Sequence, residues 1–320
     1  MILSCENVDQ IVTLSFRRRS GLHLKLGGVV RKHYNLARGE NPISYDVGQA
    51  LLALPPSKIG IFTGAVVPDH LPRGENDGPL GSLVLGHALR QRGHQVIYFT
   101  EREVFPMMER GMASYGDVCE LIGLEKNRQD RHAGTGQGLD VAIMVEKAGG
   151  NSVGVMHSAN GNSRDGTRAN IDGLVDRMNA EGKLTIGFGE FGNEIGFGKI
   201  YNQAREVTPY GKKCQCPCGQ GNVSRVATTY LFPAGTSNWG AYGTAAALAI
   251  LAGDESLAHT PEKERELLEI AVEVDCRDGG TGKATFSVDG VPGQASVALV
   301  GLLATAVQFG LATSDPDRPF

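Results

Sequence analysis

The sequence of 320 residues lacks a long uninterrupted apolar run. A helix that crosses a bilayer needs about 18 consecutive apolar residues, and no stretch approaches that length. Near the amino terminus, Glu6 and Asp9 interrupt the apolar character, which differs from the pattern of a cleaved secretion signal. We therefore expect a cytoplasmic protein that has no membrane partner.

Clustered positive charge is also missing. Lys and Arg total 31 against 35 for Asp and Glu, which gives a formal net charge of -4. The densest basic run, Arg17-Arg18-Arg19, lies between the apolar Phe16 and Leu22 and is explained most simply as the cationic end of an amphipathic helix. Because nucleic-acid binding usually demands a basic surface, no nucleic-acid partner is expected.

Cysteine is too sparse for a disulfide scaffold, with six in the chain, yet three crowd into Cys214-Gln-Cys216-Pro-Cys218. The cluster has three interpretations: a zinc or other metal site, a redox-sensitive thiol group, or ordinary reduced cysteines in a glycine-rich hairpin. A structural zinc site usually takes four ligands and a C-x-x-C spacing, and here the spacing identifies no fourth ligand. The candidates for that ligand are Cys5, Cys119, His157 and Cys276.

Short apolar segments that alternate with helix-like segments make up most of the chain. Residues 1–54 are predicted as a helical prelude to a single domain, 1–320. The predicted strands are 59–63, 95–99, 141–145, 184–188 and 227–232, and the predicted helices are 44–54, 80–92, 171–181, 193–206, 238–252, 262–274 and 293–309. This alternation predicts an α/β fold that is Rossmann-like, with a mainly parallel or mixed sheet covered by helices on both faces.

In such sheets, ligands bind outside the carboxyl ends of the strands, so the loops there carry the candidate site residues. Thr63 and Gly64 lie where the first strand ends, and Asp77 and Gly78 precede the first helix, where Asp77 could instead serve only as a helix cap. A glycine-flanked helix start suits a substrate carboxylate. Neither GxxxxGK[ST] nor GxGxxG is present, so a phosphate loop is not expected.

Glutamates follow two later strands. Glu146 comes directly after strand 141–145 and is a candidate base, although Glu146 and Lys147 could also form a solvated pair. The segment 187–198 holds five glycines together with Glu190, Asn193 and Glu194. Paired carboxylates there could bind a divalent cation or divide acid and base duties, and the alternative is a capped helix with exposed acids.

Polar side chains also follow the last predicted strand. Ser237, Asn238 and Trp239 are candidates for substrate binding, and Asp278 could add a carboxylate to the cleft. Asp289 is explained by turn chemistry alone. Without GxSxG or a suitable histidine partner, a serine hydrolase triad is rejected.

Three segments together resemble the D-glutamate cyclase-like family, in its C-terminal catalytic domain. They are Glu75-Asn76-Asp77-Gly78-Pro79-Leu80-Gly81, residues 189–198 (GEFGNEIGFG) and Thr236-Ser237-Asn238-Trp239-Gly240-Ala241-Tyr242. Their order and spacing agree with the family, as do the later segments 278–282 and 289–290. The chain departs from the family pattern at Asn76, where Thr is expected, and at Glu190, where Asp is expected.

The resemblance implies a hydro-lyase that converts D-glutamate, or a close analogue, to 5-oxo-D-proline and water. We expect Glu146, Glu190 and Glu194 to supply catalytic carboxylates, and the other candidates named above to bind the substrate. The cofactor is left open: a divalent metal would use Glu190 and Glu194 in preference to Cys214, Cys216 and Cys218. A homo-oligomer also remains open. The alternatives are a lactam or cyclic-amide hydrolase and a non-catalytic module that binds an amino acid or a nucleotide.

Overall fold

A computed structural model of the chain describes residues 1–16, 28–126 and 134–312. The run Arg17-Arg18-Arg19 lies outside these ranges. The predicted prelude contains three helices in its described part, α1 (Ile2–Val12), α3 (Val29–Ala37) and α4 (Ile43–Leu52). Their buried faces pack on the body of the protein, for example Val8 and Val12 of α1 and Val47 of α4.

The centre of the fold is a six-stranded sheet in which every pair of neighbours is parallel, in the order β3-β2-β1-β4-β5-β6. This order is the one typical of the Rossmann fold, so the predicted α/β class and the parallel sheet are confirmed. The strands are β1 (Lys58–Phe62), β2 (Gln95–Glu101), β3 (Glu120–Leu124), β4 (Val141–Val145), β5 (Leu184–Gly189) and β6 (Tyr230–Pro233).

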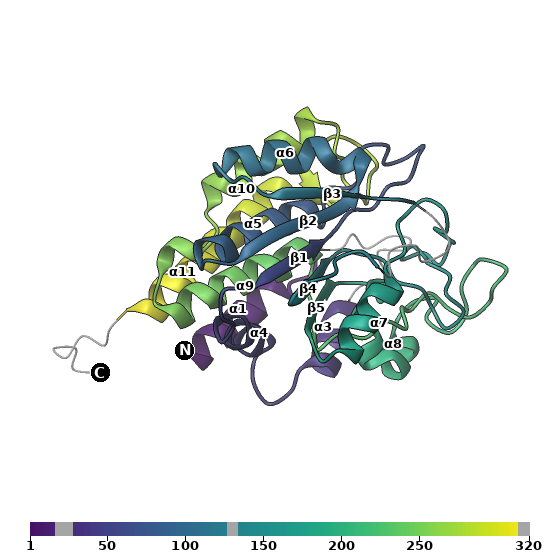
Figure 1. Ribbon diagram of the computed structural model, residues 1–320, viewed down its shortest axis with the longest axis horizontal. Helices are drawn as coiled ribbons and strands as arrows, with labels where there is room; N and C mark the ends of the chain where they lie inside the picture. The colour runs from purple at the N-terminus through teal and green to yellow at the C-terminus, as the bar shows by residue number, and fades with distance from the viewer. Residues whose placement is uncertain (17–27, 127–133, 313–320) are drawn as a thin grey trace.

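Alternating residues of the strands supply the cores on the two faces of the sheet. Ile59 and Ile61 of β1 belong to the larger core, whereas Phe62 belongs to the smaller one. The larger core includes α5 (Pro79–Gln91) and α9 (Ser237–Ala252), and α7 (Asp172–Ala180) packs on the opposite face (Figure 1). The remaining α-helices are α6 (Phe105–Ser114), α8 (Tyr201–Val207), α10 (Pro261–Glu273) and α11 (Gly293–Leu311).

Two predicted elements differ clearly from the structure, and neither β3 nor α6 was predicted. The helix predicted over 193–206 begins only at the 3-10 turn η2 (Gly198–Ile200), which continues into α8. Before that turn, the backbone bonds to neighbouring loops: Ile195 N donates to Lys147 O and Gly196 N to Val226 O, both at 2.8 Å. Because these amides are used across loops, the segment cannot coil, and Asn193 does not cap a helix. The last strand, predicted from 227, begins at Tyr230.

Within the described ranges, α11 is the one helix long and apolar enough to pass a test for a membrane span. One such helix is weak support for a membrane protein. A single face of α11, including Leu299, Val300 and Leu303, packs into the larger core beside α9 and α10. A core helix of this kind satisfies the same length and composition test.

Candidate functional site

A cavity of about 280 Å³ opens at the carboxyl ends of β1, β4 and β5. Strand β1 lies between β2 and β4, so the connections that leave β1 and β4 run to opposite halves of the sheet. Parallel sheets commonly bind ligands at such a switch point. The polar side chains of the cavity wall are His70, Glu75, Glu146, Ser158, Asn160, Arg164, Arg168, Glu190, Asn193 and Asp289.

Glu146 is the carboxyl group that the fold constrains most. It follows β4 directly, with a φ of 53°, a left-handed conformation that costs about 1–3 kcal/mol outside glycine and tends to occur at functional sites. Ser237 Oγ donates a hydrogen bond to its Oε2 at 2.5 Å. Burial raises the pKa of Glu146 well above the ordinary value of a glutamate, and the charges of Glu194 and Asp77 raise it further. The raised pKa favours the protonated form of Glu146, which is the form that can donate a proton.

Glu75 and two arginines form the opposite wall of the same cavity. Burial raises the pKa of Glu75 to about 8, although Arg168, with Nη2 3.8 Å from Glu75 Oε1, acts to lower it. The Nε atoms of Arg164 and Arg168 are buried and have no hydrogen-bond partner among the described residues. Because a buried donor without a partner is costly, these guanidinium groups favour an anionic ligand in the cavity.

Arg168 is held by a buried ion pair beneath the cavity. Lys147 Nζ donates to Glu101 Oε1 at 2.7 Å, and the amide of Ala169 donates to the same oxygen at 2.8 Å. Lys147 and Glu101 are both buried, so the solvated pair of Glu146 with Lys147 does not form. Glu101 instead accepts from the amide of Ala169 and so fixes the backbone next to Arg168. The side chain of Arg168 lines the cavity.

Three further carboxylates converge beside the cavity. One oxygen each from Asp77, Glu190 and Asp289 lies within 4.8 Å of the others. These residues come from the start of α5, the end of β5 and the turn after β7 (Ser287–Val288). Oxygen ligands at this spacing suit a hard divalent cation, and exposed acidic groups of this kind are also common without one. Glu190 was predicted as a ligand in such a group, together with Glu194. In the structure its partners in the group are Asp77 and Asp289, and not Glu194.

Asp77 and Asn238 tie the starts of α5 and α9 to each other, and we call this contact the helix lock. Asp77 accepts hydrogen bonds from the amides of Ser237 at 3.0 Å and Asn238 at 2.8 Å. In return, Asn238 Oδ1 accepts from the amides of Gly78 at 2.8 Å and Gly81 at 2.7 Å. Each helix start is thus bound by a side chain that precedes or begins the other helix. Asp77, which was foreseen as a cap for its own helix, also accepts from the amide of Gly78 at 3.1 Å, and Thr236 caps α9 locally. Substrate binding by Asp77 and Asn238 stays a prediction.

Two other predicted carboxylates stabilise their own loops. Glu194 accepts hydrogen bonds from the amides of Phe191 at 3.3 Å and Gly192 at 2.9 Å, and burial raises its pKa. Asp278 accepts from the amide of Thr281 at 2.8 Å and from Ser287 Oγ at 2.5 Å. Both residues therefore shape loops around the cavity, and their contact with a substrate also stays a prediction.

The remaining predicted residues lie behind the wall, apart from Asn193, which lines the cavity. Trp239 is buried, and its Nε1 donates to Ser296 Oγ at 3.0 Å. Thr63, Gly64 and Gly78 form a tight backbone layer, since a Cβ on Gly78 would lie 2.4 Å from Thr63 Oγ1 and one on Gly64 would lie 2.3 Å from Thr100 Oγ1. The φ angles are also positive, 100° at Gly64 and 99° at Gly78. The close packing and these angles explain why both positions are glycine.

The sequence analysis missed Glu75, Arg164 and Arg168, and it assigned Asp289 to a turn only. Glu75 lies in one of the segments that resemble the family, but no role was predicted for it. The two arginines lie in the irregular segment between β4 and α7, where neither apolar periodicity nor spacing marks a site. A φ of 50° at Asp289 became visible only in the structure.

Comparison with known proteins identifies the family of the chain. The family model described as "D-glutamate cyclase-like, C-terminal" matches residues 31–304. The chain is also similar to "D-glutamate cyclase, mitochondrial" of Homo sapiens, with 28% identity over 184 residues. That alignment covers 48% of this chain and 27% of the human protein, so the chain corresponds to only a part of its relative.

Proposed function

Because the chain belongs to the D-glutamate cyclase-like family, we propose that it closes D-glutamate, or a close analogue, to 5-oxo-D-proline with loss of water. The observation that carries this proposal is the cavity wall, where the carboxyl group of Glu146, whose pKa is raised, and the guanidinium of Arg168, whose buried Nε has no hydrogen-bond partner among the described residues, line one small space. Its volume of about 280 Å³ is at the small end of known ligand sites and suits a molecule the size of an amino acid.

The reaction joins the amino nitrogen of the substrate to its own γ-carboxyl carbon. The C–N bond forms, a C–O bond breaks, and the oxygen departs as water. Two of the three ammonium protons leave the nitrogen, and two protons reach the departing oxygen, so charge and atoms balance. The enzyme must therefore move protons between two groups of a single bound molecule and hold those groups close together.

The cavity offers a group for each part of this task. Glu146 would protonate the γ-carboxyl oxygen that leaves, since its raised pKa favours the protonated form. Glu190 would accept a proton from the amine. Arg168, with Arg164 beside it, would bind the α-carboxylate and fold the substrate so that its two reacting ends meet.

A divalent cation is a further part of the proposal. Asp77, Glu190 and Asp289 would hold it through carboxylate oxygens. A cation there would polarise a carboxyl oxygen of the substrate. Activity should then fall on addition of EDTA and return with added Mg²⁺ or Mn²⁺, whereas activity that is unchanged after exhaustive dialysis against EDTA would remove the cation from the mechanism.

The direct test is incubation of the pure protein with D-glutamate and, separately, with 5-oxo-D-proline, followed by chromatography on a chiral phase. Both reactions should approach the same final ratio of 5-oxo-D-proline to D-glutamate. The L-enantiomers serve as stereochemical controls. Turnover that starts only from cyclic amides would favour the hydrolase. Saturable binding of glutamate without turnover would favour a binding module. No binding and no turnover with any of these compounds would contradict the proposal.

A cytoplasmic location and self-association are also proposed. Cell fractionation and light scattering test them directly.

A further inference from the structure

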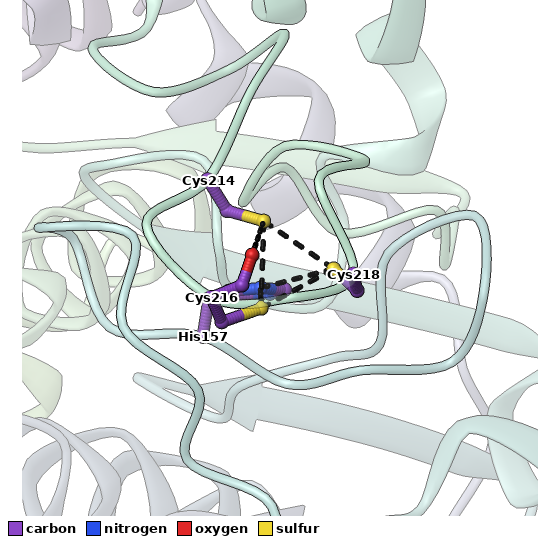
Figure 2. A group of neighbouring side chains, drawn as sticks. All are labelled: His157, Cys214, Cys216 and Cys218. Carbon is purple, nitrogen blue, oxygen red and sulfur yellow. Dashed lines mark hydrogen bonds between the residues drawn. The ribbon is translucent and has the colours of Figure 1, made fainter.

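Four potential metal ligands lie outside the cavity, in two segments far apart in the sequence. Cys214, Cys216 and Cys218 lie between α8 and β6, and His157 lies between β4 and α7. Figure 2 shows that the four side chains converge on one point. One ligand atom from each residue lies within 4.8 Å of the other three. The sequence alone could not choose among four candidates for the fourth ligand, and the fold selects His157.

The distances within this cluster match the edges of a zinc tetrahedron. The sulfur of Cys214 lies 3.5 Å from that of Cys216 and 3.3 Å from that of Cys218, and the latter two sulfurs are 3.3 Å apart. Zinc bonds of about 2.3 Å to sulfur and about 2.0 Å to nitrogen imply edges of about 3.8 Å between sulfurs and about 3.5 Å between sulfur and nitrogen. The observed separations are all within about half an ångström of these edges.

His157 presents the appropriate ring nitrogen to the sulfurs. Its Nε2 lies 3.2 Å from Cys216 Sγ and 3.7 Å from Cys218 Sγ. The opposite nitrogen, Nδ1, has no hydrogen-bond partner in the described part of the chain. The ring is fully buried, so it cannot turn toward solvent for a partner. Nε2 is therefore the nitrogen positioned as a ligand.

Reduced thiols alone do not account for this arrangement. The three cysteines are free, and their sulfurs are much farther apart than the roughly 2.05 Å of a disulfide. Neutral thiols are weak donors and weak acceptors, so three of them gain little from such close approach. A cation between three thiolates and an imidazole supplies the missing attraction.

We propose that His157, Cys214, Cys216 and Cys218 form a structural zinc site. Four protein ligands fill the tetrahedron and leave no open position, which is typical of structural zinc and not of catalytic zinc. The Nδ2 group of Asn151 donates toward Cys218 Sγ at 3.5 Å and toward Gly221 O at 2.8 Å, and so supports the ligands from outside.

The zinc site joins two long segments that contain neither a helix nor a strand. Between β4 and α7, and again between α8 and β6, the chain runs without a helix or strand over residues 146–171 and 208–229. Irregular segments of this length are uncommon in compact domains and are often functional. Besides the proposed ligands, the two segments are joined by hydrogen bonds such as Gln215 N to Gly161 O at 2.9 Å and Asn222 Nδ2 to Ala159 O at 3.1 Å.

This junction also determines the shape of the cavity wall. The residues directly after His157, namely Ser158, Ala159 and Asn160, line the cavity, as do Arg164 and Arg168 farther along the same segment. Zinc would therefore act as a positioning group for the wall that holds the arginines. This consequence rests on the proposed function, whereas the presence of zinc does not.

The test is metal analysis of the full chain, expressed with added zinc and purified without chelator. We expect about one zinc per chain that survives gel filtration. In the variants Cys218→Ser and His157→Ala the zinc content should fall to background, whereas Cys119→Ser, which removes a thiol outside the cluster, should keep it. A wild-type protein that retains no zinc, or a Cys218→Ser variant that retains the full amount, would overturn the proposal.

Cobalt provides a readout that depends on neither activity nor the folding of a variant. Wild-type protein reconstituted with Co²⁺ should show thiolate-to-metal charge-transfer absorption and the intense visible bands of tetrahedral coordination. Octahedral cobalt bands would contradict the site, and so would a mass two hydrogens lower in the unreduced protein, which would reveal a disulfide. If zinc is present and D-glutamate is not converted, the metal site stands and only the proposed reaction fails.

Discussion

The helix lock and the cavity wall lie next to each other, and both are rich in polar side chains, yet they use these groups in opposite ways. In the lock, Asp77 and Asn238 bind backbone amides at both helix starts. In the wall, Glu146 faces other buried carboxyl groups, and the Nε atom of Arg168 has no partner among the described residues. The same types of residue therefore stabilise the fold in one place and remain available to a ligand in the other.

The difference follows from what each carboxyl group meets. Amides at a helix start stabilise the charged form of Asp77, since they donate hydrogen bonds and carry the positive end of the helix dipole. Glu146 meets one hydroxyl group and several like charges in a buried place, so its neutral form is favoured. A carboxyl group whose raised pKa favours the protonated form suits an acid catalyst, and it would be a poor anchor for a helix.

The largest effect is expected from Glu146→Gln. The amide keeps the shape of the protonated carboxyl group but cannot give up its proton in the same way. Loss of a general acid typically lowers the rate about 10²–10⁴-fold, and we expect a fall in kcat of that order with little change in stability. The measurement is steady-state cyclase kinetics, with the exposed Glu109→Gln as the matched control. A folded Glu146→Gln protein with wild-type kcat would show that Glu146 is not the acid catalyst.

Arg168→Met tests whether the wall binds a substrate carboxylate. Hydrogen bonds to charged groups contribute about 1.5–3 kcal/mol, so KM should rise roughly 10- to 100-fold while kcat changes less. Arg168→Lys keeps the positive charge but loses the planar guanidinium, so its KM should lie between those of the wild type and Arg168→Met. The exposed Arg92→Met is the control. An unchanged KM in Arg168→Met would show that this arginine does not bind the substrate.

Asn238→Ala tests the lock. The variant loses the acceptor for the amides of Gly78 and Gly81, and loss of a helix cap costs about 1–2 kcal/mol. Urea unfolding should show this decrease in the free energy of unfolding. Thr260→Ala, which removes the cap of α10, is the comparison and should cost about 1 kcal/mol. If Asn238→Ala keeps its stability and loses turnover, the residue belongs to the wall and contacts the substrate.

The most gradual effect, spread over several pH units, concerns the dependence of stability on pH. The pKa of Glu75 is about 8 in the folded protein against an ordinary value of 4.5, so the folded state binds more protons. Its contribution to stability is complete below pH 4.5 and is lost as the pH rises toward 8, with a slope of at most about 1.4 kcal/mol per pH unit. Urea midpoints across this range should decline less steeply in Glu75→Gln than in Glu109→Gln. Equal slopes would contradict the raised pKa.

Prediction from sequence succeeded where the signal was local. The run at 141–145 is apolar throughout, and Ile59, Ile61 and Phe62 dominate the run at 59–63, because both faces of a central parallel strand are buried. The structure has strands at both places, β4 with the predicted bounds and β1 one residue earlier than predicted. Prediction failed for the edge strand β3, whose residues Glu120 to Gly123 are not fully buried and carry no such pattern. It also failed for residues 193–197, where glutamate, asparagine and isoleucine allow a helix but hydrogen bonds to other loops prevent one.

The sequence by itself determined the parallel α/β architecture, the family and the segments that end at the carboxyl edge of the sheet, because periodicity and turn residues are local properties. Only the tertiary structure decided which polar groups meet. It paired Asp77 with the start of α9, brought Arg168 and Glu146 to the lining of one cavity, and brought His157 to the three cysteines. These contacts depend on distances between segments far apart in the chain, and residue spacing does not encode such distances.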